Sequence, residues 1–378
     1  MIIGLGSVAG TCGGSVRAWD VRLSAHEQDG WRGNSYPRGW IRLQYQTNGR
    51  HGEIVDVRKD AVLVTGAAGF GGSHLVRKLL AHGHRVTGLD IVPPLHAGLL
   101  RRELEHPEFR YAWKSLQDMQ PGDVEGHPVV AHLAAQADTP MAFGSPRYAV
   151  MQNIEGTVAL LEAVRNAGGV RKMLYAGSGN EIGRPLTLPI DESHPLTPHN
   201  PYGFSKAAAE LAVWAWRRAY GVPAVVLSTG VVIGPRMRRE VFIFKWLWNA
   251  MHGLPIVVEG GQQTRDLSFI DDVISAWVRA IQAPEDVVVG EKFFVGNGEE
   301  RTVAELAEWC LEASGADVPI EYVGYRPGEE GQREAFSAEK ASRALGHKPR
   351  VSAKEAVRLT ADWVRTLALA APEEAQPV

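Results

Sequence analysis

The sequence predicts an α/β fold in which a doubly wound parallel sheet is followed by a smaller C-terminal α/β lobe. Two observations carry this prediction. From Ala61 onward, short apolar runs typical of buried strands alternate with helical stretches of about ten to fifteen residues, the pattern of a parallel sheet covered by helices on both faces. A glycine-rich turn also joins the first of these strands to the first helix.

The composition excludes several classes of protein. The chain has 378 residues and a formal net charge of -3, which predicts no general attraction to nucleic acid or to an anionic membrane. No apolar run reaches the roughly 18 residues that a membrane span needs. The two cysteines, Cys12 and Cys310, give neither a metal-ligand spacing nor a disulfide framework. We therefore expect a cytoplasmic protein that binds no nucleic acid, no membrane and no metal.

Residues 1–60 show no sustained helical or strand period. Three interpretations stay open: a poorly ordered extension, a small added β element, or upstream sequence included by a wrong start. We favour a poorly ordered N-terminal extension.

The regular pattern begins at Ala61. The predicted strands are Ala61–Thr65, Arg85–Asp90, Val129–Leu133, Lys172–Tyr175 and Ala224–Ser228, and the predicted helices are Ser73–His82, Asn153–Ala167 and Ala207–Tyr220. After Pro235 the alternation gives way to a Trp-rich helix, Val241–His252, with loops and short strands, which suggests a second lobe. We assign 61–235 with 263–298 to a nucleotide-binding domain, 236–262 with 299–350 to a substrate-binding lobe, and 351–378 to a C-terminal helix and frayed tail.

The glycine-rich turn has the spacing Gly-x-x-Gly-x-x-Gly at Gly66, Gly69 and Gly72. Glycines so placed let backbone amides approach a pyrophosphate, and the helix N-terminus offers unpaired N–H groups to it. Asp90 ends the next strand, near where an acid binds the adenosine ribose hydroxyls. No Arg or Lys directly follows Asp90 to hold a 2′-phosphate, so the pattern favours a Rossmann domain with NAD over NADP. A structural turn with a loop Asp is the alternative.

Tyr202 and Lys206 form Tyr-x-x-x-Lys at the head of a helical stretch. One helical turn separates them, so both side chains project from the same face. An ammonium close to the phenol would favour the phenolate and lower the Tyr202 pKa from about 10. Such a phenolate can take a proton from an alcohol while a nicotinamide accepts the hydride. Taken alone, the pattern fits an ordinary Tyr and Lys on a helix surface better.

Further motifs follow in order along the chain. They are Thr65–Gly72, His132–Gln136, Asn153 with Gly156–Thr157, Tyr175–Ser178, Pro201–Lys206, Gly234–Arg236, Gln263–Asp266, Phe269–Val273, Val295–Gly298, Arg326–Glu329, and Leu345–Gly346 before Pro349. On these residues, the chain from about Ala61 to about Pro349 resembles the extended short-chain dehydrogenase/reductase family. The resemblance is to its NAD-dependent nucleotide-sugar epimerases and dehydratases, such as the UDP-glucose 4-epimerases.

The resemblance implies roles for individual residues. Tyr202 is expected to be the catalytic base, Lys206 its electrostatic partner, and Ser178 the group that hydrogen-bonds the reacting hydroxyl. Arg265 and Arg326 are expected to bind the substrate diphosphate, since a planar guanidinium pairs bidentately with phosphate oxygens. The expected NAD-binding residues are Gly66, Gly69, Phe70, Gly71, Gly72, Asp90, Leu133, Ala134, Ala135, Tyr202 and Lys206.

Three other residue types near these motifs are expected to serve structure. His132 is expected to pack rather than to take part in chemistry, and Asn153 to satisfy buried backbone groups. Trp246 and Trp248 could form the floor of a base or sugar pocket, but we favour the core for both.

The chain departs from the family pattern after Ser178. Gly179 and Asn180 stand where the 4,6-dehydratases have an Asp-Glu pair that eliminates water, and neither side chain can move a proton. Glu181 comes one place late, and a one-residue shift on extended chain points a side chain to the opposite face. This weighs against dehydration and, less firmly, against decarboxylation. Departures at Leu227–Val231 and Ser115–Leu116 leave NAD binding expected and the identity of the sugar open.

We therefore expect epimerisation at C4 of a nucleotide-activated sugar, through a transient 4-keto intermediate and with retained NAD. A dehydratase, decarboxylase or reductase of the same family is the alternative, and a catalytically silent NAD-binding sensor is an alternative of another class. A homodimer is also expected, because apolar helix faces suit a four-helix contact, although they could pack on the sheet instead. These faces hold Val158, Leu161, Val164, Leu211 and Trp214.

Overall fold

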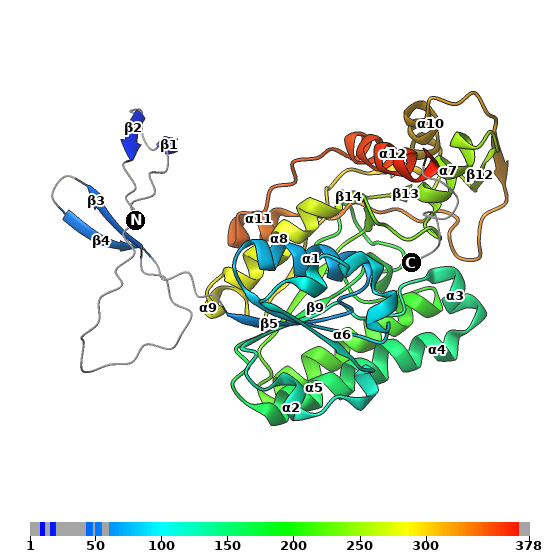
Figure 1. Cartoon of the computed structure of the whole chain (residues 1–378). Helices are drawn as coiled ribbons and strands as arrows, with labels where there is room; N and C mark the ends of the chain where they lie inside the picture. The colour runs from blue at the N-terminus through cyan, green and yellow to red at the C-terminus, as the bar shows by residue number, and fades with distance from the viewer. Residues whose placement is uncertain (1–7, 12–15, 20–42, 48–49, 55–59, 370–378) are drawn as a thin grey trace, which may run out of the picture. The chain divides into compact units, whose positions relative to one another are not determined.

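In this computed structural model, the residues that the structure describes are 8–11, 16–19, 43–47, 50–54 and 60–369. The chain divides into two compact units, Met1–Asp60 and Ala61–Val378. In the first unit, two antiparallel strand pairs are described (Figure 1): β1 (Val8–Thr11) with β2 (Val16–Trp19), and β3 (Leu43–Thr47) with β4 (Arg50–Ile54). Most of the residues covered by the prediction of a poorly ordered extension lie outside the described part of the chain.

A seven-stranded parallel sheet forms the centre of the second unit, in the order β15-β10-β9-β8-β5-β6-β7. The chain winds outward from β5 in both directions, which confirms the predicted doubly wound parallel sheet. The strands are β5 (Ala61–Thr65), β6 (Arg85–Asp90), β7 (Phe109–Trp113), β8 (Val129–His132), β9 (Lys172–Ala176), β10 (Ala224–Ser228) and β15 (Lys292–Phe294).

The two edge strands, β7 and β15, were not predicted. In β7 the sequence Phe-Arg-Tyr-Ala-Trp mixes buried and exposed side chains, and β15 has only three residues. Neither gives the continuous apolar run of a central strand in a parallel sheet.

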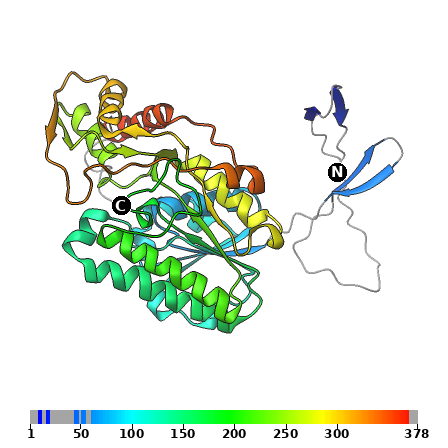
Figure 2. The same ribbon diagram turned by 180° about the vertical axis from the view of Figure 1, so that it is seen from behind.

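Helices cover both faces of the sheet because side chains alternate along each strand. In β5, Val62 and Val64 face the hydrophobic cluster shared with α1 (Phe70–Ala81) and α8 (Ile270–Gln282), whereas Leu63 faces the cluster shared with α5 (Gly156–Ala167) and α6 (Pro201–Tyr220). The two layers lie on opposite sides of the sheet in both ribbon views (Figures 1 and 2).

A second group of elements packs beyond the carboxyl ends of the strands, where the C-terminal part of the chain returns (Figure 2). Here α7, α10 and α12 contact one another and share one hydrophobic cluster. Three small sheets join this region: β12 with β17, β13 with β16, and β11 with β14. The bounds are α7 (Phe242–Met251), α10 (Val303–Ser314), α12 (Ala353–Leu369), β11 (Val231–Ile233), β12 (Ile256–Glu259), β13 (Thr264–Arg265), β14 (Leu267–Phe269), β16 (Arg301–Thr302) and β17 (Ile320–Val323).

The remaining helices are short. They are α2 (Pro121–Val124), α3 (Thr139–Gly144), α4 (Pro146–Val150), α9 (Glu285–Val288) and α11 (Glu339–Leu345), with a π-helical turn at Met151–Glu155 that leads into α5. Within the described residues, no helix is both long enough and apolar enough to cross a membrane.

Helix α6 begins at Pro201, earlier than the predicted Ala207. The side chain of Asn200 accepts a hydrogen bond from the Gly203 N–H at 2.7 Å, and proline follows at the first helical position. Both features start a helix, because they satisfy or remove donors that have no partner within it. The first turn of α6 therefore carries Tyr202.

The apolar helix faces expected to form a dimer contact are divided in the structure. Leu161 and Val164 are buried in the cluster beneath the sheet, so for them the alternative of packing on the sheet holds. Leu211 is 59% exposed on α6, and Trp214 is half-buried. Other exposed apolar side chains on α4, the π-helical turn and α6 are Tyr148, Met151 and Phe204.

Candidate active site

Two cavities lie at the carboxyl ends of the sheet strands, where ligands bind in open α/β sheets. The smaller has a volume of about 340 Å³ and lies at the glycine-rich turn between β5 and α1. The larger has a volume of about 480 Å³ and extends from the end of β9 and the start of α6 to α7 and the small sheets. Ala137, Asp138 and Arg238 line both cavities, so the two are neighbours.

The smaller cavity collects most of the residues predicted to bind a dinucleotide. Those that line it are Gly66, Gly69, Asp90, Leu133, Ala134 and Ala135. Gly66 has a positive φ of 71°, and a β-carbon there would stand 2.6 Å from the backbone nitrogen of Ala134. Any larger residue would push the glycine-rich turn away from the loop after β8, so only glycine allows the close contact between them.

Asp90 closes the smaller cavity at the end of β6. Its carboxylate accepts hydrogen bonds from the N–H groups of Ala68 at 2.9 Å and Val92 at 3.1 Å. Burial raises the pKa of Asp90, and the backbone hydrogen bonds oppose that shift. The fixed acid next to the glycine turn is the arrangement that binds ribose hydroxyls, so the residues present fit a dinucleotide.

The other predicted cofactor residues do not line the smaller cavity. Gly72 packs against the carbonyl group of Gly66, so its role is the close fit of helix on strand. A β-carbon at Gly71 would lie 3.3 Å from a methyl carbon of Leu133, and Phe70 makes an edge contact with His74 at 5.5 Å between ring centroids. Lys206 lines neither cavity.

The larger cavity brings together Ser178, Tyr202, Arg265 and Arg326. Ser178 lies two residues after β9 and Tyr202 lies in the first turn of α6, and a hydrogen bond between their side chains favours the ionised phenol. Burial has the larger effect, so the pKa of Tyr202 lies above its usual value of 10.0. The sequence predicted a lowered pKa, and this direction is wrong for the structure because the cost of desolvating the phenolate exceeds the stabilisation.

Lys206 is buried one turn along α6. Its ammonium donates a hydrogen bond to the carbonyl oxygen of Ala176 at 2.6 Å and lies 4.1 Å from the ring centroid of Tyr175. Burial lowers the pKa of Lys206 to about 8, while nearby Glu181 and Glu210 oppose the shift. Lys206 is thus held at the end of β9, behind the part of the larger cavity's wall that includes Ser178.

The residues after Ser178 form a short turn with a buried interior. Gly179 and Asn180 line the larger cavity, and Glu181 does not, as its late position predicted. A β-carbon at Gly179 would overlap the ring of Phe336, which is fully buried and stacks on Phe294 at 4.9 Å between centroids. The space that an acidic side chain would need at this position is therefore occupied by an aromatic ring.

Both predicted phosphate-binding arginines are paired with carboxylates. Arg265 lies 3.0 Å from Glu329 and 3.9 Å from Glu334, and Arg326 forms an ion pair with Glu259. All five side chains line the larger cavity. An incoming diphosphate would have to share these guanidinium groups with the glutamates.

Two residues behave as structural groups. His132 is hydrogen-bonded between the hydroxyls of Thr65 at 2.7 Å and Thr157 at 3.0 Å, and burial lowers its pKa to about 3, so the ring is neutral. The side chain of Asn153 bonds both the N–H and the C=O of Gln136, at 2.7 and 3.0 Å. Both predictions of a structural role are confirmed.

The tryptophans of α7 differ from each other. Trp248 stacks on Phe244 at 5.8 Å between centroids and does not line the larger cavity. Trp246 is buried and donates a hydrogen bond to Val257, yet part of it lines that cavity. Trp246 is therefore in the core as predicted and also contributes to the cavity wall, whereas Trp248 is half-buried and packs against the core.

Two groups near the site were not predicted. Arg238, at the junction of the cavities, donates a hydrogen bond to the carbonyl oxygen of Ala137 at 2.6 Å. The second group is a buried ion cluster of Glu181, Glu210 and Lys292 behind Ser178. The run of basic residues after Gly234 could have drawn attention to Arg238, whereas nothing in the local sequence links Glu181 to a lysine in β15.

The chain is similar in sequence and fold to known nucleotide-sugar epimerases and dehydratases. The model of the NAD dependent epimerase/dehydratase family matches residues 62–296. A UDP-glucose 4-epimerase of Mycolicibacterium smegmatis is 34% identical over 80% of this chain and 98% of its own length. A dTDP-glucose 4,6-dehydratase of an Actinoplanes species is 32% identical over 80% of this chain and 97% of its own. The structure of UDP-glucuronic acid 4-epimerase from Bacillus cereus, in complex with UDP-glucuronic acid and NAD, superposes with a TM-score of 0.76 at 26% identity, over 81% of this chain and 99% of that one.

Proposed function

This chain belongs to the NAD dependent epimerase/dehydratase family, and from that premise we propose that it epimerises a nucleotide-activated sugar at C4. The observation that carries the proposal is the composition of the wall around Tyr202. Ser178 and Tyr202 can bind and deprotonate a hydroxyl, while the next two residues, Gly179 and Asn180, offer no acid or base for removing a second group from the sugar.

The cofactor is NAD, as in the family and in the similar solved structure. Gly66 and Gly69 would hold its pyrophosphate against the N-terminus of α1, and Asp90 its adenosine ribose. When bound, NAD supplies the acceptor for the C4 hydride and the donor for its return. Ala134 and Ala135 would keep the floor of the site open, because their side chains are small.

The chain's own residues account for the proton chemistry. Ser178 would hydrogen-bond the C4 hydroxyl, and Tyr202 would take the proton of that hydroxyl. Tyr202 would return the proton after the 4-keto sugar has rotated in the cavity to present its opposite face. Arg265 and Arg326 would bind the diphosphate at the far side of the larger cavity. Binding energy from that remote group can hold a sugar that is only loosely gripped at C4.

Phe336 supports epimerisation over dehydration. Its buried ring takes the space beside Gly179, where the resemblance to the dehydratases would require an aspartate. A net reductase or decarboxylase would use the same Ser178 and Tyr202, but the reductase would consume external NADH and the decarboxylase would release a changed sugar.

We further propose a cytoplasmic homodimer. The exposed side chains of Tyr148, Met151, Phe204 and Leu211 offer an apolar surface on α4, the π-helical turn and α6 that a second copy could cover.

A sugar panel tests the proposal. The purified protein, without added NAD, is incubated with UDP-, GDP- and dTDP-activated hexoses and hexuronates, and the sugars are followed by proton NMR. Inversion at C4 of one substrate is expected. A 4-keto-6-deoxy product would assign a dehydratase, and conversion only with added cofactor would assign a net redox enzyme.

A further inference from the structure

A fully buried glutamate lies directly behind the serine of the active site. Glu181 has 0% exposure, and its Oε1 accepts a hydrogen bond from the backbone N–H of Ser178 at 3.0 Å. The hydroxyl of Ser178 in turn accepts one from the N–H of Asn180 at 3.2 Å. These reciprocal bonds form a capping box that fixes the turn Gly179–Glu181 to the end of β9.

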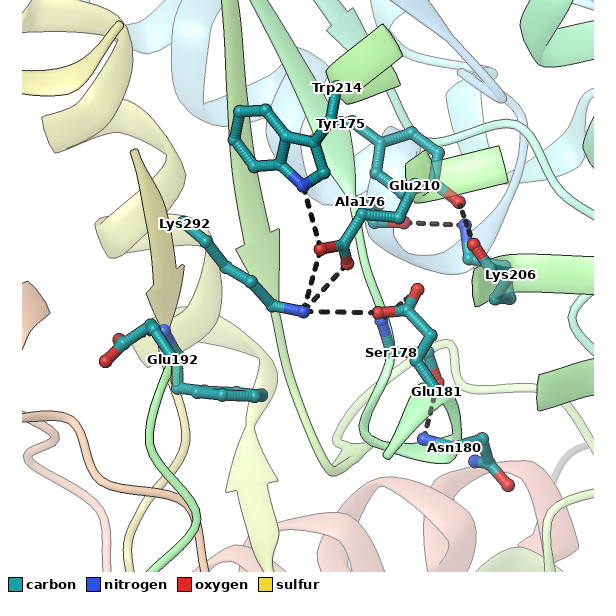
Figure 3. Close-up of polar contacts among 11 residues, drawn as sticks. Tyr175, Ala176, Ser178, Asn180, Glu181, Glu192, Lys206, Glu210, Trp214 and Lys292 are labelled. Atoms are coloured by element: carbon teal, nitrogen blue, oxygen red, sulfur yellow. Dashed lines mark hydrogen bonds and ion pairs between the residues drawn. The ribbon is translucent and has the colours of Figure 1, made fainter. Parts of the chain in front are cut away.

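The far side of Glu181 meets a cluster contributed by two other elements. Lys292, the first residue of β15, places its ammonium 3.6 Å from Glu181 and 2.8 and 3.0 Å from the two carboxylate oxygens of Glu210. Glu210 lies two turns after Tyr202 on α6 and also accepts a hydrogen bond from Trp214 at 3.0 Å. Figure 3 shows the side chains of Glu181, Glu210 and Lys292 converging behind Ser178.

The cluster therefore connects the turn that carries Ser178 to the helix that carries Tyr202. Two shorter links join the same pair of elements. The side chain of Asn200, at the start of α6, donates to the side chain of Asn180 at 3.1 Å, and Gly203 packs directly against the carbonyl group of Asn180. With β15 and α6 both anchored to Glu181, the turn has little freedom to move relative to Tyr202.

We propose that Glu181 is a positioning residue for the reaction, whose carboxyl, held from behind by Lys292 and Glu210, keeps the hydroxyl of Ser178 against Tyr202. The inference rests on the proposed function and adds a group outside the cavity wall.

The charges around Glu181 support an uncharged carboxyl. The ionisable groups that face it are Tyr175 from β9, Tyr202, Lys206 and Glu210 from α6, and Lys292 from β15. Burial and the neighbouring Glu210 raise the pKa of Glu181 well above 4.5, whereas Lys292 and hydrogen bonds lower that of Glu210. Glu210 thus carries the negative charge that Lys292 neutralises, and Glu181 keeps its proton. An ionised Glu181 would make the phenolate of Tyr202 harder to form.

Substituting Glu181 tests the hydrogen bond separately from the charge. Glu181→Gln keeps an acceptor for the Ser178 N–H in a neutral side chain of the same shape, and Glu181→Leu removes it. The Leu variant is expected to lower kcat about tenfold with little change in KM, because the freed N–H lets Ser178 shift. The Gln variant is expected to restore most of the lost kcat.

A double-mutant cycle with Ser178→Ala separates positioning from general damage to the fold. If Glu181 acts through Ser178, Glu181→Leu costs less than about twofold in kcat when Ser178 is already Ala. Equal losses in both backgrounds, or no loss in the native background, would overturn the proposal. If the Leu variant does not fold, Glu181→Met takes its place, since its flexible side chain fills the same space.

Amide hydrogen exchange gives a readout that needs no substrate. Peptides that cover 177–182 are expected to exchange at least about tenfold faster in Glu181→Leu than in the native protein, while β9 and the Gln variant stay at the native rate. Exchange of these peptides at the native rate in the Leu variant would overturn the proposal. If these peptides exchange faster in Glu181→Leu but the native protein converts none of the sugars, the result would support the role of Glu181 in fixing Ser178. It would contradict the proposed epimerase activity instead.

Discussion

The ring of Phe336 lies against the backbone of Gly179: a β-carbon built at Gly179 would come within 2.9 Å of Phe336 Cε2 and nearer still to Cζ. Gly179→Asp is therefore expected to destabilise the protein by about 1–3 kcal/mol, because the core around the ring is closely packed. Urea unfolding measures this cost. Gly324→Asp is the matched control, since an added β-carbon there meets nothing within 4 Å.

The same substitution in a Phe336→Ala background tests the cause. With the ring removed, the aspartate should cost clearly less, which a double-mutant cycle reports as a coupling energy. An unchanged cost would mean that the clash with Phe336 is not what excludes a side chain at Gly179.

Tyr202→Phe is expected to lower turnover by about 10² to 10⁴, because the variant cannot transfer the hydroxyl proton. Cofactor binding should persist, since the ring still fills its place beside Ser178. Turnover is followed by NMR, and bound NAD by absorbance after denaturation. Tyr220→Phe, at an exposed position, is the control. Native turnover in Tyr202→Phe would contradict the role of Tyr202 and favour another base.

Arg326→Gln is expected to raise KM for the nucleotide sugar about tenfold while changing kcat little, because a diphosphate contact far from C4 binds substrate and transition state alike. Arg326 is the better test than Arg265, whose removal would also leave buried Glu334 without its cation. Arg333→Gln is a suitable control, since Arg333 pairs with Glu300 and does not line the larger cavity. A drop in kcat with constant KM would place Arg326 near the reacting carbon instead.

Lys292→Met is expected to cost about 3–5 kcal/mol in the free energy of unfolding, because the buried carboxylate of Glu210 loses its cation. Lys340→Met should cost about 1 kcal/mol or less, since the Lys340–Glu291 pair is partly exposed.

The pH dependence identifies the source of the Lys292 effect. In the native protein the pKa of Glu210 is lowered, so its contribution to stability is present above the unfolded value of 4.5 and is lost as the pH falls through the folded one. The deficit of Lys292→Met should therefore shrink as the pH falls below about 4.5. A deficit that stays constant would point to lost packing rather than lost charge.

Leu211→Glu is expected to convert the proposed dimer to a monomer, because it places a charge on one of the exposed apolar side chains proposed to form the contact. Light scattering coupled to gel filtration measures the mass. Leu186→Glu changes a leucine that is 77% exposed, more than Leu211, and should have no effect. A native protein that is already monomeric would remove the proposal of a dimer.

Features that depend on short stretches of sequence were predicted well. The run Ala61–Thr65, the glycine spacing from Gly66 to Gly72 and the acid at Asp90 each act within one βαβ unit, so their residues are close in the sequence and in space. The start of α6 was placed too late, because its signal is a capping Asn200 and a proline rather than apolar periodicity.

Features that depend on distant contacts could not be predicted. Lys292 meets Glu181 and Glu210 only because β15 pairs with β10 at the edge of the sheet. The direction of the Tyr202 pKa shift likewise depends on burial by the whole fold, which the spacing of Tyr202 and Lys206 does not contain.

The late return of β15 also bears on how the protein is made. As the chain emerges from the ribosome, residues 61–235 appear well before Lys292, so β10 remains an unpaired edge, and Glu181 and Glu210 have no lysine to meet. A fragment of residues 61–235 would keep both defects permanently. These residues are therefore not a portable module: a gene fusion or split-protein design that uses them needs the strand Lys292–Phe294 supplied as well.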